Sequence, residues 1–163
     1  MVLSLKPLFM GEIQRMPLSC ELDFSKVEWD GCCPFTEPVK VSGEIRMAAD
    51  VVTLRADVRY VYDGVCDRCA GPVHRDGVLR MDHILVVSLN DEENDSFILI
   101  DNYQLPLDEL VEEDLLLDQP TKILCREECK GLCPHCGKDL NEGPCACHPE
   151  TVDPRLAILK ELL

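Results

Sequence analysis

The sequence predicts an α+β fold, in which an antiparallel β-meander or partly closed barrel carries a packed acidic helix and is followed by a small zinc-held segment and a terminal helix. Three observations predict it: alternation of apolar and polar residues in the first half of the chain, helical spacing of apolar residues further on, and six cysteines within a short later stretch. We expect three parts: a β-rich core at 1–121, a cysteine-rich metal-binding segment at 122–149 and a helix at 150–163.

The strands are predicted from Val39 onwards. The preceding 38 residues contain four prolines that interrupt any long helix, so they predict extended segments and turns. The runs 39–47 and 52–62 alternate with period two, and 73–89 does so in part, as half-buried strands do. Three sequential strands most simply form an antiparallel meander. The apolar run 97–100 is a further short strand.

Two helices are predicted. Near 107–118, apolar residues fall at i, i+3, i+4 and i+8, acidic residues lie near the start, and Pro120 stands beyond the end. This pattern is typical of an amphipathic helix that packs on a sheet. The second helix begins with Asp153 as N-cap and Pro154 at the first helical position. It is too short to be stable alone, so we expect it to dock.

The chain is strongly acidic, and its charge is unevenly placed. The formal net charge is -15, and no Lys or Arg stands between Met81 and Thr121, where there are twelve acidic residues. Such acidity disfavours non-specific attachment to phosphate backbones or anionic lipids and favours basic partners. There is neither a secretory signal pattern nor an apolar stretch long enough to span a bilayer, so we expect a cytoplasmic protein without membrane contact.

The segment 125–147 has too few large apolar residues to fold around a core of its own. Its centre, Leu132-Cys133-Pro134-His135-Cys136-Gly137, has the form of a zinc knuckle. In a reducing compartment such spacing favours metal over disulfides, and an all-thiolate set predicts a closed, structural Zn²⁺ site. The candidate ligands are Cys133 and Cys136 first, then Cys129 and Cys147, with Cys125 and Cys145 as near substitutes.

The pair Cys66 and Cys69 has three interpretations: ligands for the later segment, a separate redox pair, or incidental cysteines at a hairpin end. A redox pair is disfavoured because Ala70-Gly71-Pro72 follows and predicts a turn where a thioredoxin-like pair needs a helix. If both are ligands, eight cysteines suffice for two four-thiolate sites. The remaining cysteines, Cys20, Cys32 and Cys33, have no ligand spacing, so we expect them to be small buried residues.

The order of these pieces resembles one family, the YceD-like large ribosomal RNA subunit accumulation proteins. The resemblance is carried by Pro34-Phe35, Glu37-Pro38-Val39, Val41-Ser42-Gly43, Cys66-Asp67-Arg68-Cys69, Asp108-Glu109-Leu110-Val111-Glu112-Glu113, Cys129-Lys130-Gly131-Leu132-Cys133-Pro134-His135-Cys136-Gly137, Leu140-Asn141 and Asp153-Pro154-Arg155-Leu156. It implies a non-enzymatic factor that supports synthesis, processing or stability of large-subunit (23S) rRNA during ribosome assembly. It implies no small-molecule substrate.

Two arrangements reconcile this role with the acidic charge. In the first, Arg126, Lys130 and Lys138 contact RNA from the metal-held segment, together with His135. In the second, acidic residues of the helix capture a basic ribosomal protein; these residues are Glu109, Glu112, Glu113 and Asp114. The alternative from residues alone is a zinc-stabilised protein-interaction module that binds a basic partner outside ribosome assembly. An enzyme is the least favoured class, because the four histidines are scattered and match no catalytic motif.

Overall fold

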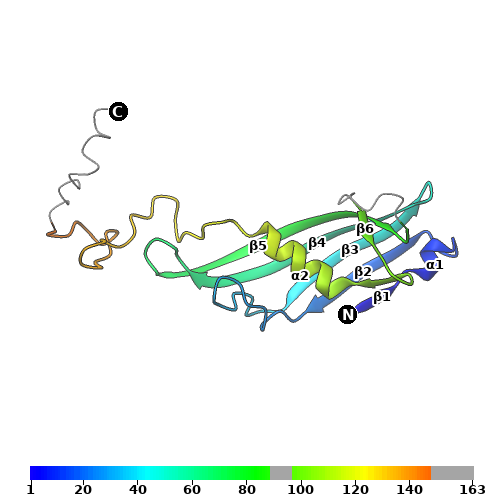
Figure 1. The fold of residues 1–163 in the computed structure, drawn as a ribbon, viewed down its shortest axis with the longest axis horizontal. Coiled ribbons are helices and arrows are strands. Elements are labelled where there is room, and N and C mark those ends of the chain that lie inside the picture. Colours follow the sequence, from blue (N-terminus) through cyan, green and yellow to red (C-terminus); the bar gives the residue numbers. More distant parts are fainter. Residues whose placement is uncertain (89–96, 148–163) are drawn as a thin grey trace, which may run out of the picture.

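The computed structural model of the protein describes residues 1–88 and 97–147. It is mostly β-structure, with a curved half-barrel sheet (Figure 1). The described residues also include two helices and two clusters of cysteines. The predicted terminal helix at 150–163 lies outside the described residues. The elements in chain order are β1 (Val2–Ser4), α1 (Lys6–Phe9), β2 (Arg15–Leu22), β3 (Val39–Ala48), β4 (Val51–Val65), β5 (Pro72–Val86), β6 (Phe97–Leu99), β7 (Gln104–Pro106) and α2 (Leu107–Asp118).

The main sheet has five strands in the order β2-β3-β4-β5-β6, and β1 pairs separately with β7. Strands β2 to β5 are joined as antiparallel neighbours, and the hairpin of β4 and β5 extends far beyond the other strands (Figure 1). The three strands predicted to form a meander are β3, β4 and β5, and the observed meander also includes β2. It does not extend to β6, which pairs with β5 in parallel. A parallel neighbour needs a return connection, which a tight hairpin turn cannot supply.

One face of the sheet is buried and the other is uncovered. In β4 the even-numbered residues from Val52 to Tyr62 are buried, while the odd-numbered residues between them are half-buried or exposed. Successive side chains of a strand point to opposite faces, so this alternation assigns one face to the core. Helix α2 crosses the buried face (Figure 1). Its buried residues are Leu107, Leu110, Val111 and Leu115.

The strands β3 and β4 approach closely at Gly43. This residue stands directly opposite Ala56, and a Cβ atom added to it would lie 2.1 Å from the backbone oxygen of Arg55. Only glycine fits at this separation, because a real Cβ needs more than 3 Å from a backbone atom.

The long connection between β2 and β3 covers one end of the core. Phe35 is fully buried in it and meets Tyr60 of β4 edge to face, with ring centroids 5.7 Å apart. Trp29 meets Tyr62 in the same way at 6.1 Å. The connection is also held by the backbone, since the N–H of Asp63 donates to the carbonyl of Pro34 at 2.8 Å.

The expectation that Cys20, Cys32 and Cys33 are buried is wrong for Cys33, which is exposed, and only partly right for the other two, which are half-buried. The reason is the loop between β2 and β3. It turns at Asp30-Gly31, both at positive φ, and pairs Trp29 with Cys32, which leaves the next residue outside the core. The Cys32 thiol donates to the Trp29 carbonyl at 3.3 Å.

Candidate metal centres

The turn between β4 and β5 presents two cysteines. Cys66 follows the last residue of β4, and Cys69 lies in the turn ahead of β5. The turn is closed by backbone hydrogen bonds from the Ala70 N–H to the Cys66 carbonyl and from the Cys66 N–H to the Gly71 carbonyl, both at 2.8 Å. Ala70 has a positive φ of 54°. The prediction of a turn after Cys69 is confirmed, and no helix begins at this pair.

The later cysteine segment lies against this turn. Asp67 forms two hydrogen bonds with Ile123: its N–H donates to the Ile123 carbonyl at 2.9 Å, and its carboxylate accepts from the Ile123 N–H at 2.6 Å. These contacts bring Cys125 and Cys129 to the turn. We call the resulting group the first cluster; its members are Cys66, Cys69, Cys125 and Cys129, whose sulfurs all lie within 4.8 Å of one another.

Arg68 fastens the segment further. Its Nη1 donates to the carbonyl of Cys129 at 2.9 Å, and its own carbonyl accepts from the Leu132 N–H at 3.0 Å. Gly131 lies between these contacts with φ of 74°, and a Cβ there would be 2.8 Å from the Arg68 oxygen. Glycine is therefore needed at 131 both for its backbone conformation and for this close approach.

The second cluster belongs entirely to the cysteine-rich segment; its members are Cys133, Cys136, Cys145 and Cys147. Here the chain forms a small hairpin, in which Leu132 bridges Asp139 and the Cys133 N–H donates to the Lys138 carbonyl at 2.8 Å. Gly137 relieves the turn with φ of 72°. The knuckle predicted at residues 132–137 thus has the backbone of a metal-binding turn.

The sulfur separations fit a tetrahedral metal site. Neighbouring sulfurs lie 3.8 Å apart for Cys66 and Cys129, 3.7 Å for Cys69 and Cys125, and 3.4 Å for Cys133 and Cys145. Four thiolates at about 2.3 Å from one Zn²⁺ stand roughly 3.8 Å apart at the corners of a tetrahedron. A disulfide needs about 2.05 Å. All eleven cysteines are free thiols, and each cluster could hold a metal ion.

Each cluster combines thiols whose pKa is lowered with thiols whose pKa is raised. Desolvation opposes ionisation of Cys66, but backbone N–H groups donate to its sulfur and lower its pKa to about 6. Backbone N–H groups likewise lower the pKa of Cys133 to about 6. Desolvation and neighbouring sulfurs raise the pKa of Cys125 to about 12, and a hydrogen bond with Cys136 followed by desolvation does the same for Cys147. A thiolate at one position makes ionisation of the neighbouring thiols less favourable. A bound divalent cation would offset this repulsion between the sulfurs.

The structure groups the predicted ligands differently from the order in which the sequence analysis ranked them. Cys133, Cys136, Cys145 and Cys147 come together, but Cys129 lies in the other cluster with Cys125. Cys66 and Cys69, which spacing could not assign, complete that first cluster. Three contributing residues were given no role from the sequence. Asp67 and Arg68 stand inside the Cys66-x-x-Cys69 pattern, which was the available signal. Asn141, whose amide Nδ2 donates to the Cys129 sulfur at 3.3 Å, had no signal beyond its place in the family resemblance.

The acidic residues of α2 do not all face solvent. Glu109 and Glu113 are exposed and Glu112 is half-exposed. Asp114 points toward the sheet, where its carboxylate lies 2.5 Å from Nε2 of His83 on β5, and both side chains are largely buried. Asp114 therefore belongs to the packing of α2 on the sheet and is not part of its exposed acidic surface.

A groove of about 300 Å³ runs beside the start of α2, and we call it the acidic groove. Its lining combines carboxylates with apolar side chains; the residues are Glu21, Leu22, Asp23, Phe24, Val27, Asp108, Glu109 and Glu112. Further along the exposed side of the helix, Leu117 is 84% exposed. Glu109, Glu113 and Leu117 are spaced by four residues, so they share one helix face.

The basic residues of the cysteine-rich segment are on its surface. Arg126, Lys130 and Lys138 are all exposed, as is His135. Lys138 donates from Nζ to the carbonyl of Pro144 at 3.1 Å, which holds its side chain along the segment. The acidic residues Glu127, Glu128 and Glu142 of the same segment are also exposed.

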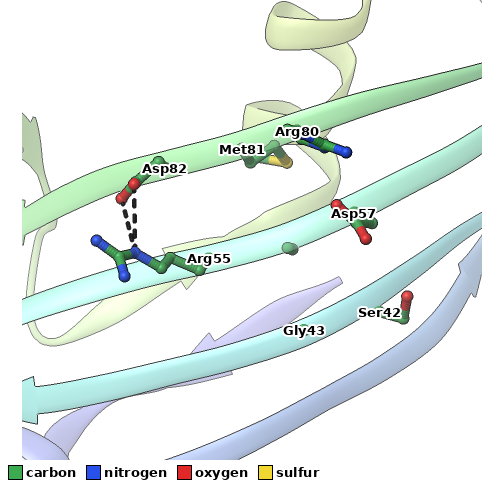
Figure 2. Close-up of a pocket in the computed structure, with 8 residues that line it drawn as sticks. Ser42, Gly43, Arg55, Asp57, Arg80, Met81 and Asp82 are labelled. Carbon is green, nitrogen blue, oxygen red and sulfur yellow. Dashed lines mark hydrogen bonds and ion pairs between the residues drawn. The ribbon is translucent and has the colours of Figure 1, made fainter.

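The uncovered face of the sheet carries charged residues in cross-strand pairs. A shallow groove of about 350 Å³ spans β3, β4 and β5 there, and Figure 2 shows Arg55 reaching across to Asp82. The Arg55 Nε lies 3.2 Å from both carboxylate oxygens of Asp82. Arg80 stands directly opposite Asp57 in the strand register.

Comparison with known proteins decides the family. The profile of the family described as large ribosomal RNA subunit accumulation protein YceD matches residues 54–163. The chain belongs to this family. The matched range begins within β4 and includes the hairpin, α2 and both cysteine clusters. The family name describes an accumulation factor for ribosomal RNA, and it does not describe an enzyme.

The curated relatives of this YceD family member are named only as uncharacterized proteins. One from Mycobacterium bovis and two from strains of Mycobacterium tuberculosis are each 33% identical to it over 104 residues. The match covers 61% of this chain and 50% of each relative, so the chain spans about half the length of the curated relatives it matches. No solved structure matches this chain. Among residues 1–88 and 97–147, no helix has the length and apolar character needed to cross a membrane.

Proposed function

We propose that this protein is a non-enzymatic factor that supports the synthesis, processing or stability of large-subunit (23S) rRNA during ribosome assembly in the cytoplasm. The observation that carries the proposal is membership of the YceD family, whose matched range spans 110 of the 163 residues from 54 to 163. The described residues agree with a binding protein, because the two cysteine clusters have the thiolate sets of closed structural sites.

Depletion of the protein in its host tests this function. We expect the ratio of large-subunit to small-subunit rRNA to fall, and the tagged chain to co-migrate with large-subunit precursors in a sucrose gradient. An unchanged ratio, with the chain only in the fractions at the top of the gradient, would overturn the proposal. It would favour the alternative, a zinc-stabilised module that binds a basic partner outside ribosome assembly.

Both clusters are proposed to bind Zn²⁺. Four thiolates with separations of 3.4 to 3.8 Å suit a tetrahedral ion, and thiolate ligands favour zinc among the divalent metals of a reducing cell. With all four positions filled by sulfur, neither ion has room for substrate or activated water. The role of the metal would be to hold residues 123–147 against the end of the β4–β5 hairpin.

The partner surface is proposed to be the acidic groove together with the exposed face of α2, and its occupant a basic ribosomal protein. A Lys or Arg side chain suits such a groove, since its aliphatic stem packs on Leu22, Phe24 and Val27 while its cationic head meets carboxylates. Leu117 offers an apolar contact on the same helix. Asp108 already pairs with the N-terminal ammonium, so the carboxylates of Glu21, Asp23, Glu109 and Glu112 are the ones proposed to meet the partner's cations.

Neutralising the exposed helix acids tests this surface. For the variant Glu109→Gln/Glu112→Gln/Glu113→Gln, we expect affinity for a purified basic ribosomal protein of the large subunit to fall about tenfold or more. Charge steering should also weaken, so the association rate should lose much of its salt dependence. Surface plasmon resonance at several salt concentrations gives both quantities.

The matched control is Glu127→Gln/Glu128→Gln/Glu142→Gln, which removes the same charge from exposed positions of the cysteine-rich segment. Equal losses in the two triple variants would mean that only net charge matters, and unchanged binding in the helix variant would remove α2 from the interface. Loss of rRNA crosslinking in an Arg126→Ala/Lys130→Ala/Lys138→Ala variant, with protein binding intact, would instead assign the contact to RNA.

A further inference from the structure

One side chain joins the two cysteine clusters. Asn141 lies between Cys136 and Cys145 in the chain, within the part that forms the second cluster, yet its Nδ2 donates to the sulfur of Cys129 in the first cluster at 3.3 Å. Its Oδ1 accepts from the backbone N–H of Lys130 at 2.9 Å. Both ends of this amide therefore contact the Cys129 region.

Asn141 is oriented by its own surroundings. Its Nδ2 also donates to the carboxylate of Asp139 at 2.7 Å, and its backbone N–H donates to the same carboxylate at 2.8 Å. The amide is half-buried and all of its polar atoms have partners. This is the arrangement of an outer partner that orients a metal ligand and stabilises its thiolate.

The position of Asn141 depends on the hairpin of the second cluster. That hairpin is closed by the Leu132 to Asp139 bridge and by the Leu140 N–H, which donates to the Gly131 carbonyl at 2.9 Å. The Cys133 and Cys136 sulfurs lie at its turn. The hairpin is short and has few buried apolar residues, so a metal ion held at its turn would supply most of its stability. Losing that ion would release Asn141 from the Cys129 sulfur.

We propose that the two zinc sites are coupled through Asn141, so that filling the second cluster strengthens metal binding at the first. This inference rests on the proposed zinc occupancy. Because coupling between two binding sites is reciprocal, filling the first cluster strengthens the second by the same factor. Removing an outer hydrogen-bond partner of a metal ligand typically weakens metal affinity by roughly 10- to 100-fold, which sets the expected size of the coupling.

The test compares single and combined variants of the chain in a mutant cycle. Co²⁺ is the probe, because tetrahedral cobalt thiolate sites absorb visible light. Alkylation of unprotected cysteines with peptide mapping assigns each bound equivalent to a cluster. The variants are Asn141→Asp, which keeps the acceptor for Lys130 but has no donor for the sulfur, and Cys133→Ser/Cys136→Ser, which removes the second site. We expect each to weaken Co²⁺ binding at the first cluster at least tenfold, and their combination to weaken it no further than the double-serine variant alone.

Two further variants make the result specific. Asp139→Asn/Asn141→Asp restores a hydrogen bond between positions 139 and 141 but still presents no donor to Cys129, so first-cluster affinity should remain low. Glu142→Gln changes the exposed neighbouring side chain and should leave affinity at the wild-type value.

The outcomes separate this inference from the zinc proposal beneath it. If the wild-type chain binds two Co²⁺ ions and the Cys133→Ser/Cys136→Ser variant keeps wild-type affinity at the first cluster, the coupling is overturned while both sites stand. Unchanged affinity in Asn141→Asp, with a loss in the double-serine variant, would show coupling by another route and so overturn the role of Asn141. Failure of the wild-type chain to bind Co²⁺ would overturn the zinc proposal, and the coupling with it.

Discussion

Stripping metal from the purified, reduced chain with a strong chelator is expected to unfold residues 123–147 while the five-stranded sheet persists. Structural zinc sites in small fingers contribute on the order of 10 to 16 kcal/mol of binding free energy, which this segment cannot replace with apolar burial. The sheet is expected to persist because most of its core is formed by strand residues, the β2–β3 connection and α2, whereas Cys66, Ile123 and Cys129 are, among the described residues, the only members of that core from the first cluster and the segment it holds.

Limited trypsin digestion reports on the folding of the cysteine-rich segment and of the sheet in one experiment. The cysteine-rich segment offers cleavage sites at Arg126, Lys130 and Lys138, while the sheet offers Arg55 and Arg80. After chelation we expect rapid cleavage at the first three and continued protection of the sheet. After chelation, the far-ultraviolet circular dichroism spectrum should still show the β signal, and that signal should still be lost in a cooperative thermal transition.

The control for metal removal is Cys32→Ser/Cys33→Ser, which deletes two cysteines outside both clusters and should leave zinc content at two ions per chain. Cys66→Ser/Cys69→Ser should lower it. A chelator that melted the sheet as well would show that the metal sites are part of the core. A chain that carried no metal after reducing purification would leave the clusters without their proposed ions.

Phe35→Ala is expected to lower the free energy of unfolding by about 3 to 5 kcal/mol, the cost of emptying a buried phenylalanine site. Phe35 has no solvent exposure and supports Tyr60 edge to face. The substitution would leave a cavity where the β2–β3 connection closes the core. Because domains of this size are stable by only about 5 to 15 kcal/mol, the loss is a large share of the total.

Urea denaturation followed by tryptophan fluorescence measures this loss, since Trp29 lies in the same connection. Phe35→Leu should cost less than Phe35→Ala because most of the volume is retained. Val78→Ala, on the uncovered face and 56% exposed, should change stability by less than about 0.5 kcal/mol. A loss below 1 kcal/mol for Phe35→Ala would contradict the packing described for this loop.

The strands were the most predictable part of the fold. Alternation assigned Val52, Leu54 and the following even positions of β4 to one face, and the structure buries them. The parallel pairing of β6 was not predictable, because three apolar residues can join an edge in either direction. The orientation of Asp114 was also hidden. Helical periodicity gives its place on α2, but only the position of His83 in the sheet makes it an inward partner.

A thiolate-rich segment after a β-rich core can be predicted from the residues alone, because cysteine spacing and alternation are local patterns. Which four sulfurs meet depends on the fold. Cys66 and Cys129 are 63 positions apart, and the length of the β4–β5 hairpin together with the Asp67 and Ile123 contacts brings them to 3.8 Å. Spacing along a chain constrains neighbours in sequence, whereas a tetrahedral site is satisfied by any sulfurs that the fold brings within reach.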